Sequence, residues 1–418
     1  MGQKEGGARL ILLTQWFEPE PAMRGLSFAA ELARRGFRVE VVTGFPNYPG
    51  GKVYDGYKIR PLQRERIGEV DVTRLALYPS HDSHRLGRIL NYVSFFLTAS
   101  FYLIFMARRA DVIYAYHPPL TVGMVAALAR VLRRMPVVLD VQDMWPDTLR
   151  ATGMIGNERL LRIIDVFCRW TWRGVDRITV LSDGFRRLLL ERDVAPEKVS
   201  VIYNWADEAA RAEAPAELPA ALADRGRLRV LFAGNMGAAQ ALDDVLDAAR
   251  LVGERDGNVD FFLLGSGIED ERLKRRASEM NLANVHFLPR VPAAAAGAWL
   301  AAADCLLVHL RDDPLFAITI PSKTQAYMSA GKPVIMAVAG DAAELVRRSG
   351  GGVIVPPAQP KALADAVMAL SRLPREELAE LGRKSARFYA EHLSFSRGVD
   401  EFVALFEDVM AAQGDRRA

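Results

Sequence analysis

The sequence is poor in cysteine. Of 418 residues only two are cysteines, Cys168 and Cys305, and neither lies in a CxxC pair or near histidines spaced to bind zinc. Both stand in apolar stretches, so we expect two buried thiols in a reducing cytosol. We also expect no secretory signal peptide, because residues 1–9 are polar and glycine-rich and the first apolar run, Leu10–Leu13, is far too short.

Several catalytic motifs are also missing. No two aspartates are two positions apart, so the sequence lacks the DxD pair with which many sugar transferases hold a metal ion on a diphosphate. Neither a GxxxxGKS/T phosphate loop nor a GxSxG nucleophile turn occurs, which argues against a P-loop ATPase and an α/β-hydrolase. The nearest approach to a dinucleotide fingerprint, at Gly265 and Gly267, has Asp270 in place of the third glycine and predicts a nicotinamide site only weakly.

Charge is unevenly divided along the chain. Residues 1–205 hold 29 Lys and Arg against 21 Asp and Glu, a net of +8, whereas residues 206–418 hold 25 against 30, a net of −5. A basic half favours an anionic partner such as a membrane surface, a phosphorylated acceptor or a nucleic acid. The alternative is an uneven use of arginine without functional meaning.

Short apolar runs alternate with helix-like segments. The predicted strands are 10–14, 39–44, 111–116, 137–143, 177–182, 228–234, 259–265, 285–289, 305–310, 333–338 and 351–356. Segments with helical periodicity include 27–35, 120–134, 242–252, 269–280, 293–303 and 360–370. This alternation predicts an α/β protein with parallel sheets covered on both faces, and the length is enough for two doubly wound domains.

The domain boundary is placed near residue 205. Residues 207–226 are rich in Ala, Pro and Glu with weak periodicity, as is typical of a linker. We expect an N-terminal domain over 1–205, a C-terminal domain over 206–392, and an amphipathic helix within 393–418 that packs back across the domain junction.

One apolar segment has three interpretations. Residues 91–107 are uncharged and rich in aromatic residues, with Arg85 and Arg88 before them and Arg108 and Arg109 after them. A membrane span needs roughly 20 apolar residues, so this run is short. It is either a buried helix covering the N-terminal sheet or a helix over about 85–109 that dips into a membrane surface, and a true span is the third possibility.

Two glycine-rich turns follow predicted strands of the second half. Gly234-Asn235-Met236-Gly237 precedes a helix, where glycines let the backbone approach a ligand and the helix N-terminus favours phosphate. Gly265-Ser266-Gly267 follows the next strand and is suited to a nucleoside. For the first of the two, a tight strand-to-helix turn without a ligand is the structural alternative.

A lysine stands at the start of a predicted helix. In Ile320-Pro321-Ser322-Lys323-Thr324, proline begins a turn and Ser322 is placed to cap the helix. Lys323 in the first turn opposes the helix dipole unless an anion lies between them. The local conflict indicates an anion-binding site, with a solvated surface lysine as the alternative.

These stretches together resemble family 4 of the glycosyltransferases, the retaining GT-B group, over nearly the whole chain. The GT-B fold has two Rossmann-like domains facing across a cleft. The matching stretches are 17–21, 44–49, 140–147, 201–205, 232–237, 320–328 and 330–335. Residues 44–51 and 320–328 look most like the WbuB-type branch, which includes transferases of bacterial surface polysaccharides and of N-acetyl-L-fucosamine.

The resemblance implies a nucleotide-sugar site in the C-terminal domain and an acceptor site in the N-terminal domain. Lys323 then neutralises the diphosphate, and Asp143 lies close to the transferred sugar. The other implied donor-binding residues are Gly234, Asn235, Gly237, Gln240, Gly265, Gly267, Phe287, Leu288, Arg290, Ser322, Thr324 and Glu344. The implied acceptor-binding residues are Glu20, Asn47, Tyr48 and His117.

The sequence departs from the family pattern in several places. The Glu-x7-Glu pair near the lysine is replaced by Ile318 and Ala326, so the ribose must be held otherwise, with Thr324, Gln325 or Glu344 as candidates. An N-terminal Gly-Gly is replaced by a stretch containing Arg24, which we expect to supply a second cation to the leaving group.

The predicted function is transfer of a sugar, with retention and without metal or cofactor, from a nucleotide donor (UDP in the first instance) to a lipid-linked glycan. The enzyme would lie on the inner face of the cytoplasmic membrane, and no nucleic-acid partner is expected. Domain closure would exclude water from the reaction. The alternatives are a nucleotide-sugar epimerase of the same fold and a non-catalytic, membrane-associated binding protein.

Overall fold

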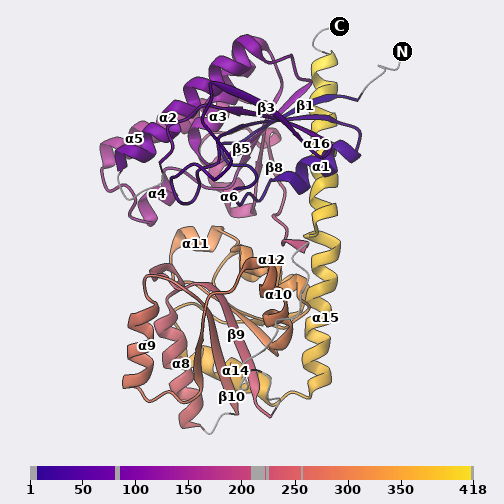
Figure 1. Ribbon diagram of the computed structural model, residues 1–418. Helices are drawn as coiled ribbons and strands as arrows, with labels where there is room; N and C mark the ends of the chain where they lie inside the picture. Colours follow the sequence, from indigo (N-terminus) through magenta and orange to yellow (C-terminus); the bar gives the residue numbers. More distant parts are fainter. Residues whose placement is uncertain (1–6, 81–84, 209–221, 223–225, 256–257, 416–418) are drawn as a thin grey trace. The chain divides into compact units, whose positions relative to one another are not determined.

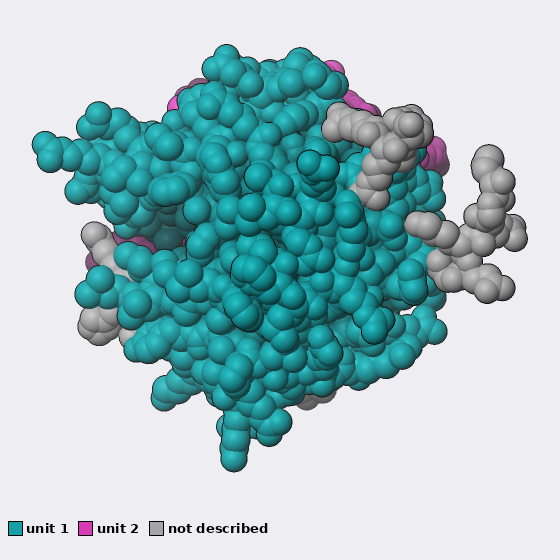
Figure 2. All heavy atoms as spheres, turned by 90° about the horizontal axis from the view of Figure 1, so that it is seen from above, with its two compact units in different colours: residues 1–181, 185–202, 399–418 teal, residues 182–184, 203–398 magenta. Residues whose placement is uncertain are grey.

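The computed structural model describes residues 7–80, 85–208, 222, 226–255 and 258–415 (Figure 1). The chain forms two compact units, which are coloured separately in Figure 2. Unit 1 consists of residues 1–181, 185–202 and 399–418, and unit 2 of residues 182–184 and 203–398. Most of the predicted linker, 207–226, lies outside the described residues.

Unit 1 is built on an eight-stranded sheet. Its strands are β1 (Arg9–Leu13), β2 (Arg38–Gly44), β3 (Leu62–Ile67), β4 (Val70–Leu75), β5 (Val112–His117), β6 (Val137–Val141), β7 (Arg177–Val180) and β8 (Val199–Val201). Their order in the sheet is β3-β4-β2-β1-β5-β6-β7-β8, and only β3 runs antiparallel to its neighbour. The strand order reverses between β1 and β5, and ligands of such sheets bind at the carboxyl ends of the strands near this point.

Helices cover both faces of this sheet. They are α1 (Leu26–Arg34), α2 (Arg85–Phe101) with a π-helical end η1 (Tyr102–Met106), α3 (Leu120–Arg133), α4 (Asp147–Ala151), α5 (Glu158–Gly174), α6 (Asp183–Leu190), the short η2 (Pro196–Lys198) and most of α16 (Phe395–Asp415). In Figure 1, α2, α3 and α5 form one layer, and α3 contacts both of the others. On the other face α16 packs on α1, with the Phe28 and Phe402 rings 5.4 Å apart.

Unit 2 contains a six-stranded parallel sheet. Its strands are β9 (Leu228–Asn235), β10 (Val259–Ser266), β11 (Val285–Leu288), β12 (Cys305–His309), β13 (Val334–Ala337) and β14 (Gly352–Ile354). The order β11-β10-β9-β12-β13-β14 reverses between β9 and β12. The carboxyl end of β9, where the Gly234 turn begins, is therefore where a doubly wound sheet binds its ligand.

The helices of unit 2 complete its core. They are η4 (Ala238–Gln240), α8 (Leu242–Glu254), α9 (Asp270–Glu279), α10 (Ala293–Ala302), α11 (Pro314–Ile318), α12 (Ser322–Ser329), α13 (Asp341–Ser349), α14 (Pro360–Ser371) and α15 (Arg375–His392). Strands β9 and β10 and helices α8 and α14 supply most of the buried aliphatic side chains.

The predicted strands are all present, but three further strands, β3, β4 and β8, were not predicted. The hairpin of β3 and β4 was not predicted because β3 reads Leu-Gln-Arg-Glu-Arg-Ile and has no apolar run. It lies at the sheet edge, where a strand needs little burial. Strand β8 has only three residues, too few for a periodic signal. Both cysteines are buried and free, and burial raises the pKa of the Cys168 thiol to about 12.

The apolar segment is helical and has two different faces. Phe95, Ala99 and Leu103 are fully buried on the inner side, whereas Leu86, Leu97 and Phe105 are exposed. On length and composition alone, Leu86–Met106 is long and apolar enough to cross a membrane, and 28% of its apolar window is buried. The helix therefore covers the sheet with one side only.

Candidate functional site

The carboxyl ends of β9 and β10 form a backbone platform in unit 2. Gly234 and Gly265 pair in register, with φ of 139° and 143°. A Cβ atom on Gly265 would overlap the Gly234 carbonyl oxygen, and one on Gly267 would overlap the Met236 carbonyl. Only glycine fits these positions, so the turn stays open to a ligand that approaches the backbone.

Lys323 reaches over this platform from the first turn of α12. Its Nζ lies 3.9 Å from the centre of the Phe232 ring, and a Cβ on Gly234 would come within 2.5 Å of its Cε. Desolvation lowers the pKa of Lys323 to about 8. Its ammonium group has no hydrogen bond or ion pair with any described residue, so the fold itself leaves this half-buried charge uncompensated. Such an arrangement suits an anionic ligand.

Tyr327 fixes the position of that lysine, and sequence reasoning missed its role. Its hydroxyl donates to the Ala233 carbonyl at 3.1 Å and accepts from the Ala233 amide at 2.8 Å. The side chain is 2% exposed, and burial raises the pKa of its phenol. One turn after Lys323, it ties α12 to the end of β9. In the sequence, the only signal for the role of Tyr327 was an aromatic residue four positions after a lysine at a helix start. Nothing in the sequence indicated that Phe232 lies beneath the lysine.

The residues around Lys323 differ in burial and in hydrogen bonding. Thr324 and Gln325 are 0% and 1% exposed, and the Thr324 hydroxyl and the Gln325 Oε1 find no hydrogen-bond partner among the described residues. Ser322 is exposed and does not cap the helix as expected, because α12 begins at Ser322 itself and Pro321 is its N-cap. Buried polar atoms without partners are uncommon, so Thr324 and Gln325 are candidate ligand contacts.

The first phosphate-loop positions are partly occupied by the protein. The Gly237 amide donates to Gln240 Oε1 at 3.0 Å, and the Gln240 carbonyl contacts His309 Nδ1 at 2.8 Å. Asn235 is exposed. The expectation that the Gly237 amide binds phosphate is therefore corrected, because its N–H already donates to Gln240. Asn235 is accessible.

The remaining donor positions lie further along the same unit. Phe287 is half-buried and Leu288 is buried at the end of β11, beside β10, and Arg290 follows them exposed. Glu344, in the first turn of α13, is bonded to Arg347 on the same helix, with Nε to Oε2 at 2.9 Å. Both partners are largely exposed, so this pair is weak and leaves Glu344 able to change partner.

In unit 1, Asp143 and His117 stand at neighbouring strand ends. His117 ends β5 in register with Val141 of β6, and Asp143 follows two residues later. Desolvation raises the pKa of Asp143 to about 6 and lowers the pKa of His117 to about 4. The Asp143 carboxylate and the His117 Nδ1 have no hydrogen-bond partner among the described residues. At neutral pH this edge thus offers a carboxylate and a neutral imidazole.

Three predicted acceptor residues turn out to be engaged within unit 1. Glu20 is 2% exposed, and its carboxylate accepts from the amides of Phe17, Asn47 and Tyr48 at 3.1, 2.6 and 2.7 Å. Asn47 is buried and accepts from Asn91 of α2 at 3.1 Å. Glu20 and Asn47 therefore shape the 45–49 loop instead of facing an acceptor, which corrects the expectation for both. Tyr48 is half-buried and packs on Trp16, with ring centres 4.9 Å apart.

Arg24 is also placed differently from expectation. Its side chain is fully buried, and Nε donates to Asp140 Oδ2 and to the Tyr114 hydroxyl, both at 3.2 Å. The guanidinium carbon lies 5.1 Å from the centre of the Phe402 ring of α16. Because a buried ion pair is costly to break, Arg24 serves the core of unit 1 and is not the second cation for a leaving group.

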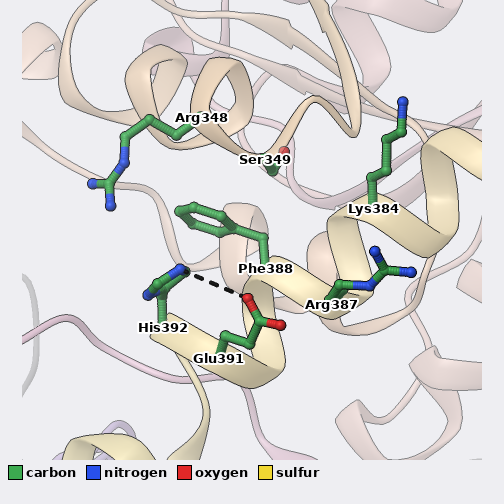
Figure 3. A pocket seen from close by; sticks show the side chains of 7 residues that line it. All are labelled: Arg348, Ser349, Lys384, Arg387, Phe388, Glu391 and His392. Carbon is green, nitrogen blue, oxygen red and sulfur yellow. Dashed lines mark ion pairs between the residues drawn. The ribbon is translucent and has the colours of Figure 1, made fainter.

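Unit 2 also has a surface hollow, which is formed by residues other than the candidate donor-binding residues. It lies between α13 and α15 (Figure 3) and is lined by Arg348, Ser349, Lys384, Arg387, Phe388, Glu391 and His392. The cationic ends of Arg348, Lys384 and Arg387 point in different directions in Figure 3, so they do not converge on one anion. Elsewhere, no three His, Cys, Asp or Glu side chains of the described ranges gather as metal ligands do.

Known families match both halves of the chain. Residues 21–205 match the family described as "Glycosyl transferase 4-like domain", and residues 227–372 match "Glycosyl transferases group 1". WcaI of Escherichia coli K12, named for a glycosyl transferase of colanic acid biosynthesis, is 30% identical over 374 residues, which cover 86% of this chain and 89% of WcaI.

Solved structures share the fold at low identity. Sucrose-phosphate synthase of Thermosynechococcus elongatus has a TM-score of 0.70 at 17% identity, covering 97% of this chain and 100% of that one. HepE of Anabaena in complex with UDP has a TM-score of 0.66 at 16% identity, covering 96% and 100%. The two Rossmann-like sheets define a glycosyltransferase of the GT-B class, as the sequence predicted.

Within that class the chain belongs to the family 4 glycosyltransferases, carrying a 4-like domain followed by a group 1 domain.

Proposed function

We propose that this glycosyltransferase moves a sugar from a UDP-linked donor, held by unit 2, to a lipid-linked glycan, with retention of configuration and without a metal ion. The pathway would be the synthesis of a cell-surface polysaccharide. N-acetyl-L-fucosamine, the sugar implied by resemblance to the WbuB-type branch, is the first donor sugar to test. The enzyme would work at the inner face of the cytoplasmic membrane as a peripheral protein.

The observation that carries the donor proposal is the uncompensated charge of Lys323. Its Nζ stands over Phe232 beside two glycine turns, and no described residue offers it an anion. A diphosphate on the Gly234 platform would supply that anion and raise the pKa of Lys323 back toward its ordinary value. The unpartnered Thr324 hydroxyl and Gln325 oxygen lie one and two residues away and are suited to sugar or ribose hydroxyls.

Charge development explains why a lysine at this point would be catalytic. When the glycosidic C–O bond breaks, the electron pair leaves with the nucleoside diphosphate, and its negative charge increases. A cation fixed beforehand by Tyr327 and Phe232 stabilises that charge without reorganisation. Because the sequence has no DxD pair to hold a metal ion, Lys323 takes the role that a divalent cation has elsewhere.

Retention is what the resemblance to the retaining GT-B group implies, and because no nucleophile is assigned in the proposed site we propose a front-face course instead of a double displacement. In the front-face course that we propose, the acceptor hydroxyl attacks from the side of the departing phosphate, which accepts the hydroxyl proton. Asp143, with its raised pKa, would orient the acceptor or the sugar as an ionised carboxylate at neutral pH. A lipid-linked acceptor is supported by the name of WcaI, which belongs to a polysaccharide pathway, and by the exposed apolar side of α2.

The proposal is tested by transfer from radiolabelled UDP-sugars to lipid in a bacterial membrane extract, with and without EDTA. We expect label in the lipid fraction, no loss of rate with EDTA, and the donor's anomeric configuration in the product by NMR. Loss of activity with EDTA would contradict metal independence, and an inverted product would contradict the front-face course. Isomerised donor without transfer would identify an epimerase, and UDP binding without turnover would identify a binding protein.

A further inference from the structure

Exposed hydrophobic side chains gather on one helical layer of unit 1. Among the described residues, fifteen of the twenty exposed large hydrophobic side chains belong to α2 with η1, to α3 and to α5, and unit 2 contributes only two. Leu86, Phe105, Val131 and Val166 are 75%, 71%, 62% and 64% exposed. Single exposed hydrophobic residues are normal on a protein surface, but a concentration of this kind marks an interaction site.

Helix α5 contributes an apolar stripe that its sequence did not reveal. Its exposed residues Leu160, Ile163, Val166, Phe167 and Trp170 recur at intervals of three and four. They therefore lie along one side of the helix, while Leu161, Cys168 and Trp172 face the core. Unlike the uncharged stretch 91–107, α5 has charged residues along its whole length, so no long apolar run marks it.

The three helices form one continuous surface. Helix α3 contacts α2 on one side and α5 on the other, and Figure 1 shows the three in one layer of unit 1. Helix α3 also presents apolar residues outward, beside the partly exposed Thr121, Arg130 and Arg133. The apolar ones are Met124 and Leu128, which are partly exposed, and Val131 and Leu132, which are exposed. The stripes of α2 and α5 are thus joined across α3.

The charge of this layer is strongly positive. Residues 85–109, 120–134 and 158–174 contain eleven arginines and only two acidic residues. Both acids are already paired, Glu158 with Arg150 and Asp165 with Arg169. Exposed arginines such as Arg108, Arg109 and Arg134 stand at the ends of the apolar stripes. An apolar surface edged by unopposed arginines complements the headgroups and acyl chains of an anionic bilayer.

Polar bonds fix α2 within the layer. The Tyr102 hydroxyl donates to Glu40 at 2.5 Å, Thr98 donates to the Ala76 carbonyl at 2.8 Å, and Asn91 donates to the Tyr78 carbonyl at 2.7 Å. A membrane-spanning α2 would break all three bonds and deprive the Ala76 and Tyr78 carbonyls of these donors. A helix lying along the interface keeps all three bonds.

We propose that the outer face of α2, α3 and α5 is a docking surface for an anionic lipid bilayer, with the three helices lying in the membrane plane. This inference rests on the proposed function in one respect: the docking surface would bring the enzyme to a lipid-linked acceptor. Helix α3 begins three residues after His117, and the loop that contains Asp143 is followed by α4 and then by α5. Two helices of the docking surface thus follow, along the chain, the strand ends that carry the proposed acceptor-side residues.

The test is flotation of the full-length protein with two kinds of vesicle. One contains phosphatidylcholine alone, and the other contains about 30% phosphatidylglycerol, which gives the vesicle a negative surface potential. The α5 variant I163E/V166E and the α2 variant L97E/F105E place charge on the proposed surface. The matched control I268E/I354E makes the same change at the two exposed sites of unit 2. Circular dichroism and thermal unfolding identify any variant that fails to fold.

We expect the wild type and the control to bind anionic vesicles at least about tenfold more tightly than neutral ones. Either surface variant should lose at least about tenfold in binding while remaining folded. An α5 variant that binds like the wild type would overturn the three-helix surface. Equal binding to both vesicle types would overturn its anionic preference. Altered oligomeric state in the variants, without vesicle binding by the wild type, would show a self-association surface instead.

UDP binding separates this inference from the proposed function. Thermal-shift titration with UDP should give the same affinity in the wild type and both surface variants. Vesicle binding without any UDP binding or transfer would contradict the proposed function and leave the docking surface standing. UDP binding and transfer to a detergent-dispersed lipid, without vesicle binding, would contradict the docking surface alone.

Discussion

The carboxyl edges of the two sheets differ in how far the protein satisfies its own polar groups. In unit 1, Arg24 is paired with Asp140, and Glu20 accepts three backbone N–H groups. In unit 2, Lys323 has no anion and Thr324 no hydrogen-bond partner within the described residues. Both edges come from the same kind of sheet, so the fold class does not cause the difference.

The difference separates structural polar groups from candidate ligand contacts. A buried polar group that already has its partners stabilises a loop, and its removal affects folding. A buried polar group without partners costs folding free energy, so its presence needs another explanation such as a ligand. Among the described residues, those that meet this criterion include Thr324 and Gln325 of unit 2 and, in unit 1, His117 together with Gln15 and Glu18. Asp143 and Lys323 are candidates for a different reason, because desolvation shifts the pKa of each half-buried charged group.

The largest expected effect is that of Lys323→Met. Removal of the cation that faces the leaving diphosphate should lower kcat/KM for transfer by about 10²–10³. The control Lys361→Met removes an exposed lysine of α14 in the same unit and should keep the wild-type rate. Rates from labelled donor, with thermal unfolding of each variant, check the prediction. An unchanged rate in Lys323→Met would remove the basis of the donor site.

The next effect is a pH dependence due to Asp143. Its pKa is raised to about 6 by desolvation, so the carboxylate becomes protonated as the pH falls through 6. If the ionised form orients the acceptor or the sugar, kcat/KM should fall about tenfold per pH unit below that value. Asp143→Asn should be slow and lack this acid limb. An identical acid limb in the variant would assign the titration to another group.

A smaller effect is expected when a satisfied group of unit 1 is removed. Glu20→Ala leaves three backbone N–H groups without an acceptor and should lower the free energy of unfolding by about 1–3 kcal/mol. UDP affinity should remain that of the wild type. Glu69→Ala, at an exposed turn of the same unit, is the control for loss of a carboxylate. Urea unfolding checks the stability and UDP titration checks the affinity. If Glu20→Ala were as stable as the wild type, the distinction between structural polar groups and ligand contacts would be contradicted.

The smallest change in stability is expected for an unsatisfied group of unit 2. Thr324→Val keeps the side-chain shape and removes a buried hydroxyl without a partner, so stability should be unchanged or rise by up to about 1 kcal/mol. Donor affinity should fall. The matched control is Thr179→Val in unit 1, whose buried hydroxyl donates to Asp140 at 3.1 Å and whose loss should destabilise the protein. Equal stability losses in the two variants would show that Thr324 is a structural residue.

Sequence reasoning located the elements better than it located the roles of polar residues. Most strands, the glycine turns and the start of the Lys323 helix follow from local pattern, because period and turn chemistry are properties of neighbouring residues. Glu20 was assigned to the acceptor because its stretch resembles the family pattern, and Arg24 to the leaving group because it stands in a stretch that replaces the family's Gly-Gly. The partners of both depend on residues distant in sequence. The apolar stripe of α5 was overlooked because charged residues alternate with it along the chain.

The sequence by itself determined the two parallel sheets, the family of the enzyme and the place of Lys323 at a helix start. Only the tertiary structure decided which polar groups are already bonded. Arg24 and Asp140 are separated by 116 residues, so no local pattern specifies their pairing. It also decided that three helices expose their apolar sides together, because exposure depends on which face of each helix the sheet has already buried.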